Sequence, residues 1–402
     1  MKIRSTYPVI LGFLFVATGL SFLDRQVLPV TIIKIQEDFH ITDIQYGIIN
    51  TSFLISYAIM FTVSGRIMDM IGGRKGLAVS LGIWSLASCL HGTMSGFIQL
   101  LSYRFLLGAG EGGCFPGAAK IVHDYFDKSK RAFANGIAIG GSALGAVAAP
   151  PLVIWVSNQY GWRWSFLVPG IIGILWLAGW LSLPWKRIET RHTEEKAVRE
   201  VIPLLKIITN KAAVIFILMR FLLDPVMYFI MSWVPKFLHE TRGTSFDEIG
   251  RLFWIPFLGL GIANIAGGWC SDLLIKKGFS LNASRKWMMG IAAAITVVAP
   301  FIAWATSVYL IIALVTLLLV AHGFWITNYI TAISDVFGKD TASIVGLSGT
   351  AGAVAGMIAN PLIGYWVQAY SYTSLWVITG AMYPLAFILF ARFIPDIKPV
   401  RI

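Results

Sequence analysis

The chain has 402 residues, of which 57% are hydrophobic and 13% are charged, and its mean hydropathy is +0.73. A soluble chain of this length needs more polar residues to cover its surface, so the composition excludes a soluble globular protein. The formal net charge of +12 does not require a nucleic-acid partner, because lysines and arginines beside membrane spans also produce it.

Apolar segments follow one another along the first half of the sequence, and several reach the length of about 20 residues that crosses a bilayer as an α-helix. The predicted spans are 8–30, 47–68, 77–91, 97–119, 132–156 and 164–183. Asp24 and Arg25 interrupt the first of them, and no small-residue cleavage site follows. We therefore interpret it as a membrane helix and not as a signal peptide.

The longest hydrophilic segment, 186–210, is rich in Lys, Arg and Glu, and it separates residues 1–185 from residues 211–402. The spans predicted after it are 214–238, 249–273, 287–304, 307–327, 343–367 and 372–393. We predict an all-α membrane protein with twelve transmembrane helices in two pseudo-symmetric six-helix bundles. The hydrophilic segment is the predicted cytoplasmic linker between them.

Lysine and arginine are unevenly distributed between alternate loops. Most of the 32 fall on the side that carries both ends of the chain and the segment 186–210. Because cytoplasmic loops hold an excess of these residues, the pattern predicts a multi-pass membrane protein with both termini in the cytoplasm.

A glycine four residues before an aspartate occurs once in each half, near the ends of the second and eighth spans. The first half has Gly65 and Asp69, followed by Arg74, and the second half has Gly268 and Asp272. Glycine allows close helix approach, and the carboxylate can meet a helix end or a basic loop. We predict that both segments are conformational latches. Their matching positions indicate an internal repeat, which is typical of alternating-access transporters.

Four ionisable residues stand out inside the predicted spans of the first half, because a charge at the bilayer centre costs about 2.5–3.5 kcal/mol. Asp24 and Arg25 are adjacent in the first span. Arg104 and Glu111 are seven residues apart in the fourth span, on one helix face and about 10 Å apart along it. The alternative to a functional site is a pair of buried salt bridges that holds the two spans together.

An incoming anion can pair with an arginine of this set only by displacing a carboxylate, which then favours its protonated form in a buried setting. This competition predicts that Arg25 and Arg104 bind substrate. It also predicts that Glu111 is the principal proton carrier. Asp24 is the secondary one, because its neighbour Arg25 should stabilise its charge.

Arg220 and Asp224 are four residues apart in the seventh span, and Pro225 follows them. This spacing allows an ion pair within one helix, and the proline can bend that helix. We interpret the pair as structural or gating.

The other candidate substrate contacts are uncharged side chains. They are Tyr57, His322, Trp325, Asn328 and Ser348. Tyr57 can equally pack between helices, and a lone histidine such as His322 is more often a hydrogen-bonded packing residue than a ligand.

Several of these segments resemble one known family. Residues 65–75 resemble the loop 2–3 signature of the major facilitator superfamily. Residues 103–117, Tyr-Arg-Phe-Leu-Leu-Gly-Ala-Gly-Glu-Gly-Gly-Cys-Phe-Pro-Gly, resemble helix 4 of its anion:cation symporter branch, which includes bacterial hexuronate and galactonate transporters. The stretches 24–26, 145–151, 220–225 and 322–328 agree with this resemblance.

The resemblance implies the major facilitator fold, in which two six-helix bundles rock about a central site. It implies uptake of an organic anion with a cation, usually a proton, across the bacterial inner membrane. It also implies that the acidic and basic positions of spans one and four serve proton coupling and substrate binding.

Three positions depart from the sugar-acid pattern of that branch. Phe22 stands where relatives often carry tyrosine, Ile139 where they often carry a polar amide, and Cys114 where asparagine is common. Each lost hydrogen bond disfavours a heavily hydroxylated ligand by about 1–3 kcal/mol. The predicted substrate is therefore an organic monocarboxylate, either a sugar acid such as a hexuronate or aldonate, or a less hydroxylated organic acid.

Other functional classes lack sequence support. Phosphate-loop, dinucleotide, metal-ligand and nucleophile-elbow patterns are missing, because the glycine clusters lie in apolar segments. We predict no enzymatic activity, no cofactor, no metal and no nucleic-acid partner, and a monomer in the bilayer. Sodium coupling, a proton-coupled exporter of small metabolites or drugs, and a substrate-sensing receptor remain alternatives.

Overall fold

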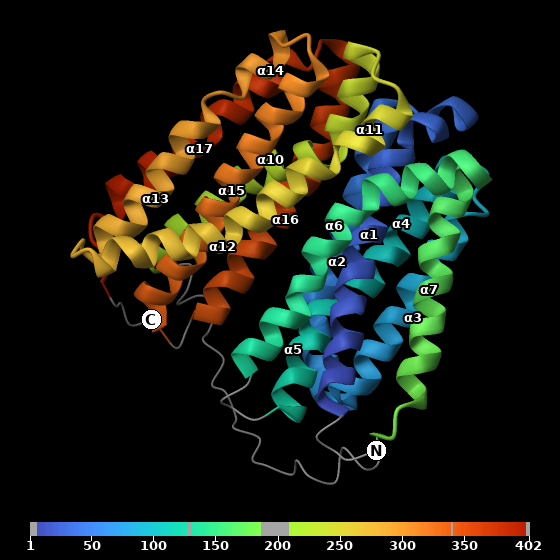
Figure 1. The fold of residues 1–402 in the computed structure, drawn as a ribbon, viewed down its shortest axis with the longest axis horizontal. Helices are drawn as coiled ribbons and strands as arrows, with labels where there is room; N and C mark the ends of the chain where they lie inside the picture. The colour runs from blue at the N-terminus through green and yellow to red at the C-terminus, as the bar shows by residue number, and fades with distance from the viewer. Residues whose placement is uncertain (1–5, 127–130, 186–208, 339–340, 399–402) are drawn as a thin grey trace. The chain divides into compact units, whose positions relative to one another are not determined.

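The computed structural model describes residues 6–126, 131–185, 209–338 and 341–398, and the regular secondary structure in these ranges is helical (Figure 1). The helices of the first half are α1 (Thr6–Phe39), α2 (Asp43–Ile71), α3 (Gly73–His91), α4 (Phe97–Glu111), α5 (Cys114–Tyr125), α6 (Arg131–Tyr160) and α7 (Trp162–Ser182). Those of the second half are α10 (Lys211–Arg242), α11 (Phe246–Leu252), α12 (Trp254–Lys276), α13 (Leu281–Thr296), α14 (Pro300–Trp304), α15 (Val308–Phe337), α16 (Thr341–Ala369) and α17 (Thr373–Phe393).

Ten helical segments of the described residues are long and apolar enough to cross a membrane. Helix α3 and the broken pair α4 and α5 complete the twelve segments expected from the sequence. The predicted all-α membrane fold is therefore confirmed.

The predicted span 97–119 is wrong in one respect, because the helix is interrupted at Gly112 and Gly113. The chain passes close to α2 and α3 at this point. A Cβ atom on Gly112 would lie 2.7 Å from the Cβ atom of Met60, and one on Gly113 would overlap the Ser80 hydroxyl. The interruption leaves Glu111 as the last residue of α4.

The described helices group into two compact units. Unit 1 comprises Met1–Val198 and Phe246–Trp254, and unit 2 comprises Arg199–Ser245 and Ile255–Ile402. The short helix α11 therefore belongs with unit 1, although it follows the predicted boundary in the sequence. Most of the predicted linker, 186–208, lies outside the described residues.

Unit 1 is built on a close contact between α1 and α6. A Cβ atom on Gly141 would overlap the carbonyl oxygen of Phe15, and one on Gly145 would overlap that of Gly19. Small residues allow helices to approach in this way inside a membrane. Helix α3 packs on α4 and α7, and α2 packs on α4.

The same pairing recurs in unit 2. Its first long helix, α10, packs along α16, and α13 packs on α15 and α17. The first segment thus contacts the fifth in each unit, and the third contacts the fourth and the sixth. This repetition agrees with the internal repeat that the two Gly-xxx-Asp segments indicate.

Candidate functional site

The charged residues of α1 and α4 meet in the interior of unit 1. The Nε atom of Arg25 donates to Oε2 of Glu111 at 2.6 Å, and the hydroxyl of Ser21 donates to the same oxygen at 2.9 Å. Glu111 is 0% exposed. The expectation that Arg25 would stabilise the charge of its neighbour Asp24 is wrong, because its guanidinium group binds the carboxylate of the other helix.

Asp24 is buried and turns toward α3, where its Oδ1 atom lies 2.6 Å from the hydroxyl of Ser88. That hydroxyl also lies 3.0 Å from the carbonyl oxygen of Phe166, but it has a single hydrogen to donate. Both contacts are satisfied together only when Asp24 is protonated and itself donates to Ser88. Among the described contacts Asp24 forms no ion pair. The geometry therefore fits a neutral Asp24.

Arg104 is 3% exposed, and its Nε and Nη2 atoms are buried without a hydrogen-bond partner. In the described part of the chain it also forms no ion pair. Buried polar groups are normally paired, and leaving charged ones unpaired is costly. The guanidinium group of Arg104 thus has the capacity to bind an anion.

Aromatic rings surround the guanidinium group of Arg25. Its Cζ atom lies 4.5 Å from the ring centroid of Tyr57, 4.9 Å from that of Phe22 and 5.6 Å from that of Phe53. The Phe53 centroid also lies 5.9 Å from the Cζ atom of Arg104. Phe53 therefore contacts both candidate substrate-binding arginines, and the Tyr57 ring lies over one of them.

Sequence reasoning missed three residues of this cluster. Ser21 lies one helical turn before Arg25, so helical spacing from a charged residue would have found it. Ser88 and Phe53 lie in other spans, and no local pattern marks them. Whether these side chains face the cluster depends on how α2 and α3 are rotated about their own axes, and the sequence alone does not determine this.

The predicted uncharged contacts of the second half are distributed over α15 and α16. The Nδ1 atom of His322 lies 2.5 Å from the hydroxyl of Tyr383, and the Trp325 ring meets the same tyrosine edge-on at 5.4 Å. Ser348 is buried and donates to the carbonyl of Val345. Asn328 donates to the carbonyls of Phe324 and Gly267, so its amide group ties α15 to α12.

Arg220 and Asp224 form the ion pair that their spacing predicts. The Nε atom of Arg220 lies 2.6 Å from Oδ1 of Asp224. Asp224 is held against α16, where a Cβ atom on Gly352 would overlap its Oδ2 atom.

The predicted latch of the first half is only partly described, because the side chain of Asp69 lies outside the described residues. The expectation that Gly65 allows a close approach of another helix is wrong, because a Cβ atom on Gly65 would meet nothing within 4 Å. Gly72, with φ of +85°, makes the tight turn between α2 and α3. The guanidinium group of Arg74 lies 5.1 Å from the ring centroid of Trp185.

The predicted latch of the second half centres on an arginine that the sequence did not single out. Arg285 is 6% exposed and binds Asp335 at 3.2 Å and the Ser271 hydroxyl at 2.6 Å. Asp272 is exposed and lies 3.8 Å from Arg285. A Cβ atom on Gly268 would lie 3.3 Å from a methyl group of Thr327. The cluster joins the ends of α12, α13 and α15.

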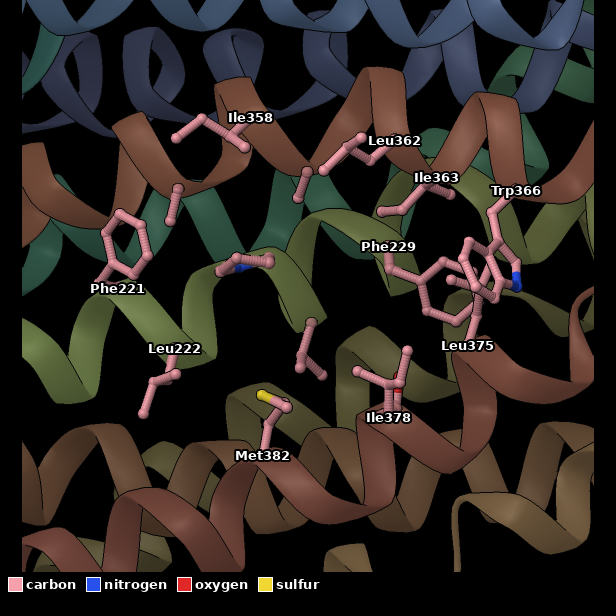
Figure 2. Close-up of a pocket in the computed structure, with 15 residues that line it drawn as sticks. Phe221, Leu222, Phe229, Ile358, Leu362, Ile363, Trp366, Leu375, Ile378 and Met382 are labelled. Carbon is pink, nitrogen blue, oxygen red and sulfur yellow. The ribbon is translucent and has the colours of Figure 1, made fainter.

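An apolar pocket of about 390 Å³ lies between α10, α16 and α17, where Figure 2 shows Phe221, Ile358 and Met382 around it. None of its lining side chains is ionisable. An organic anion would find no charge partner there, so the pocket is not a candidate anion site. The described residues also contain no cluster that could hold a metal ion.

The sequence profile of the Major Facilitator Superfamily matches residues 14–283 and 226–401 of the chain. A hexuronate transporter of Bacillus subtilis is 29% identical over 98% of this chain and 96% of its own. A D-galactonate transporter of Escherichia coli O6:H1 is 25% identical over 97% of this chain and 96% of its own. A probable sulfoacetate transporter of Cupriavidus necator is 26% identical over 95% of this chain and 93% of its own.

Solved structures of membrane transporters share the fold. The crystal structure of a D-xylose–proton symporter has a TM-score of 0.76 at 17% identity and covers 98% of this chain and 99% of its own. A bacterial homologue of the human lysosomal transporter Spinster, in an inward-facing and occupied conformation, has a TM-score of 0.74 at 20% identity. The match covers 98% of this chain and 92% of the homologue.

Proposed function

Since the chain belongs to the Major Facilitator Superfamily, a family of transporters and not of enzymes, we propose that it takes up an organic carboxylate anion together with a proton, by alternating access. The observation that carries this proposal is the buried guanidinium group of Arg104, whose Nε and Nη2 atoms have no partner. An intramembrane arginine without a counter-ion is costly, and a carboxylate ligand would remove that cost.

The proposed coupling begins when the substrate carboxylate binds Arg104 and competes for Arg25. Glu111 then loses its strongest partner while it remains buried, and an unpaired buried carboxylate favours the protonated form. Asp24 holds a proton before the anion arrives, which the shared hydroxyl of Ser88 supports. Two carboxyl groups with different partners thus provide separate steps of proton binding and release.

The proposed substrate is an organic monocarboxylate, either a sugar acid or an acid with fewer hydroxyl groups. Phe22 packs against the guanidinium group of Arg25, and Cys114 is fully buried, so two positions beside the cluster lack a strong hydrogen-bonding side chain. Ile139, by contrast, is exposed, so the apolar side chain at this position does not take the place of a buried hydrogen-bonding group. Relatives named for hexuronate, galactonate and sulfoacetate support an organic acid and span a wide range of hydroxylation.

The proposed setting is the bacterial inner membrane, with both termini in the cytoplasm and the protein acting as a monomer. The distribution of lysine and arginine between alternate loops supports this orientation. A proton is the proposed coupling ion because the cluster offers two carboxyl groups near arginine. Sodium is the alternative that a gradient experiment distinguishes.

Uptake into proteoliposomes tests this proposal. Purified protein should accumulate labelled D-glucuronate, D-galactonate or sulfoacetate when the outside is made acidic. A sodium gradient without a pH difference should not drive accumulation. If none of the three acids accumulates or competes under a pH gradient, the proposed function is wrong. Accumulation driven by sodium alone would replace the proton with sodium.

A further inference from the structure

We propose that a groove between α13 and α17 binds an anionic phospholipid, with Lys286 holding the phosphate of the headgroup and apolar side chains holding an acyl chain. The inference goes beyond the proposed function, because it concerns the membrane around unit 2 and not the transported substrate. Both helices belong to unit 2, and they pack against each other.

The groove has a volume of about 560 Å³, and one of its lining side chains is charged. Helix α13 contributes Ala283, Lys286, Trp287, Gly290, Ile291 and Ala294, and α17 contributes Phe387. The first and last of the α13 residues are eleven positions apart, which corresponds to about 16 Å along the helix. This length matches the hydrocarbon depth of one bilayer leaflet, about 15 Å. The groove is therefore long enough to hold an acyl chain.

The walls of the groove lie at the surface of the chain. Trp287 is 60% exposed and Ile291 is 45% exposed. A Cβ atom on Gly290 would lie 3.0 Å from the ring of Phe387, so the glycine lets that ring lie against α13. Tryptophan is common at the level of lipid headgroups, and Trp287 directly follows the charged residue of the groove. The charge therefore lies where a headgroup is expected and the apolar residues where a chain is expected.

The ammonium group of Lys286 has donors to spare. Its Nζ atom donates to the carbonyl oxygen of Pro395 at 2.6 Å, which uses one of three N–H groups. Among the described residues Lys286 forms no ion pair. Asp396 attracts it through space, but the carboxylate of Asp396 binds Lys398 at 2.9 Å. Lys286 therefore keeps two N–H donors for a phosphate oxygen.

Lys286 is also held in place, unlike a lysine on a free surface. The carbonyl oxygen of Pro395 accepts a second hydrogen bond from Asn282 at 3.1 Å, and the amide oxygen of Asn282 accepts one from the backbone of Ile397 at 3.3 Å. These bonds tie the segment after α17 to the first turn of α13. A cation that is already positioned loses less conformational freedom when it binds a ligand. The start of α13 adds the partial positive charge of a helix N-terminus.

An anionic phospholipid complements both the charge and the apolar walls. No acidic residue lines the groove. A second copy of the chain in a two-fold contact would place one positively charged groove against another, which like charges oppose. Basic pockets between membrane helices bind anionic headgroups on the cytoplasmic side, where the proposed orientation puts the start of α13. The apolar pocket of Figure 2 has no ionisable lining residue and so has no group that selects a headgroup.

Three probes test the inference with purified full-length protein in detergent: dioleoylphosphatidylglycerol, dioleoylphosphatidylcholine and glycerol 1-phosphate. Ligand-dependent thermal stabilisation gives the apparent affinity for each. The unaltered protein should bind the anionic lipid about tenfold more tightly than the zwitterionic one, as expected for one charged hydrogen-bonding contact. Glycerol 1-phosphate has no acyl chain to bury and should not stabilise the protein. Equal affinity for both lipids, or equal stabilisation by glycerol 1-phosphate, would overturn the inference.

Lys286→Gln should reduce the preference for the anionic lipid to about twofold or less, as expected for loss of one charged contact. Lys277→Gln is the matched control, because it removes the same charge from an exposed position in the turn before α13, outside the groove. It should retain the preference. Equal losses in the two variants would show a general attraction to basic residues and would contradict a site at Lys286.

Ala294→Phe places a ring in the groove and should weaken the binding of both lipids, by about fourfold for each methylene group displaced. Ala381→Phe adds the same ring at an exposed position of α17 outside the groove and should leave both affinities unchanged. Unchanged lipid binding by Ala294→Phe would overturn the inference.

Native mass spectrometry of the same samples should show bound phosphatidylglycerol on the unaltered protein and less of it on Lys286→Gln. If the unaltered protein is instead a dimer that Ala294→Phe separates, a second copy fills the groove and the inference is wrong. None of these measurements requires transport, so the lipid site and the proposed function stand or fall separately.

Discussion

Arg25 binds Glu111, 86 residues away in the sequence, while its neighbour Asp24 faces Ser88 on a third helix. Adjacent residues on a helix are about 100° apart around its axis, so the two side chains reach different partners. The cluster therefore separates its two carboxyl groups, one held by a cation and one by a hydroxyl.

Glu111→Gln should bind the substrate anion and exchange it across the membrane, but it should not accumulate it under a pH difference. The amide imitates the protonated carboxyl group and cannot release a proton. Counterflow and pH-driven accumulation are to be measured in the same liposomes. Full accumulation by this variant would move the coupling role to Asp24 or His322.

Asp24→Asn should leave the protein folded and its anion affinity within about threefold, because an amide can donate to the Ser88 hydroxyl as a protonated carboxyl group does. Asp24→Leu, of similar size, removes that donor and should lower the unfolding temperature. The comparison of the two melting curves is the measurement. Equal losses of stability in both variants would contradict a neutral, donating Asp24.

Arg104→Lys should reduce substrate affinity by about tenfold or more, because lysine lacks the planar fork that binds a carboxylate through two bonds. Arg25→Lys should behave similarly and should also weaken the contact with Glu111. Substrate affinity is to be measured by ligand-dependent thermal stabilisation, with Arg251→Lys as the surface control. Undiminished affinity in both variants would show that neither arginine binds the anion.

Phe53→Leu should weaken anion binding by about three- to tenfold, since the ring contacts both guanidinium groups and a cation–π contact contributes about 0.5–2 kcal/mol. Phe53→Tyr keeps the ring and should retain most of the affinity. Competition against a labelled acid measures both. A loss in the tyrosine variant as large as that in the leucine variant would point to packing instead.

Gly141→Ala should destabilise the protein, because the added methyl group overlaps the carbonyl oxygen of Phe15 and forces α1 away from α6. Overpacking of this kind costs about 1–3 kcal/mol. Gly136→Ala, on the same helix, meets open space and is the matched control. Thermal unfolding in detergent should separate the two, and an unchanged Gly141→Ala protein would contradict the α1–α6 contact.

The sequence predicted the number of membrane segments, because hydropathy over about 20 residues reports burial in lipid directly. It also singled out Arg25 and Glu111, which form an ion pair, because charged residues are costly in a membrane. The partner of Arg25 was not predictable, because the choice between Asp24 and Glu111 depends on the rotation of α1 against α4. The break at Gly112 likewise depends on Met60 and Ser80, which lie on other helices.

The role of Arg285 illustrates a different limit. It lies at the predicted cytoplasmic end of its span, where lysine and arginine are in excess, so the orientation pattern accounted for it without a further role. Its burial and its contact with Asp335 follow only from the packing of α13 on α15.

The two arginine–carboxylate pairs differ in what they connect. Arg25 and Glu111 belong to α1 and α4, whereas Arg220 and Asp224 belong to the single helix α10. Breaking the first pair removes a link between two helices and frees them to shift against each other. Breaking the second changes no connection between helices. Under the proposed function, an anion that competes for Arg25 would therefore release α1 from α4, whereas the ion pair of α10 stays within its own helix.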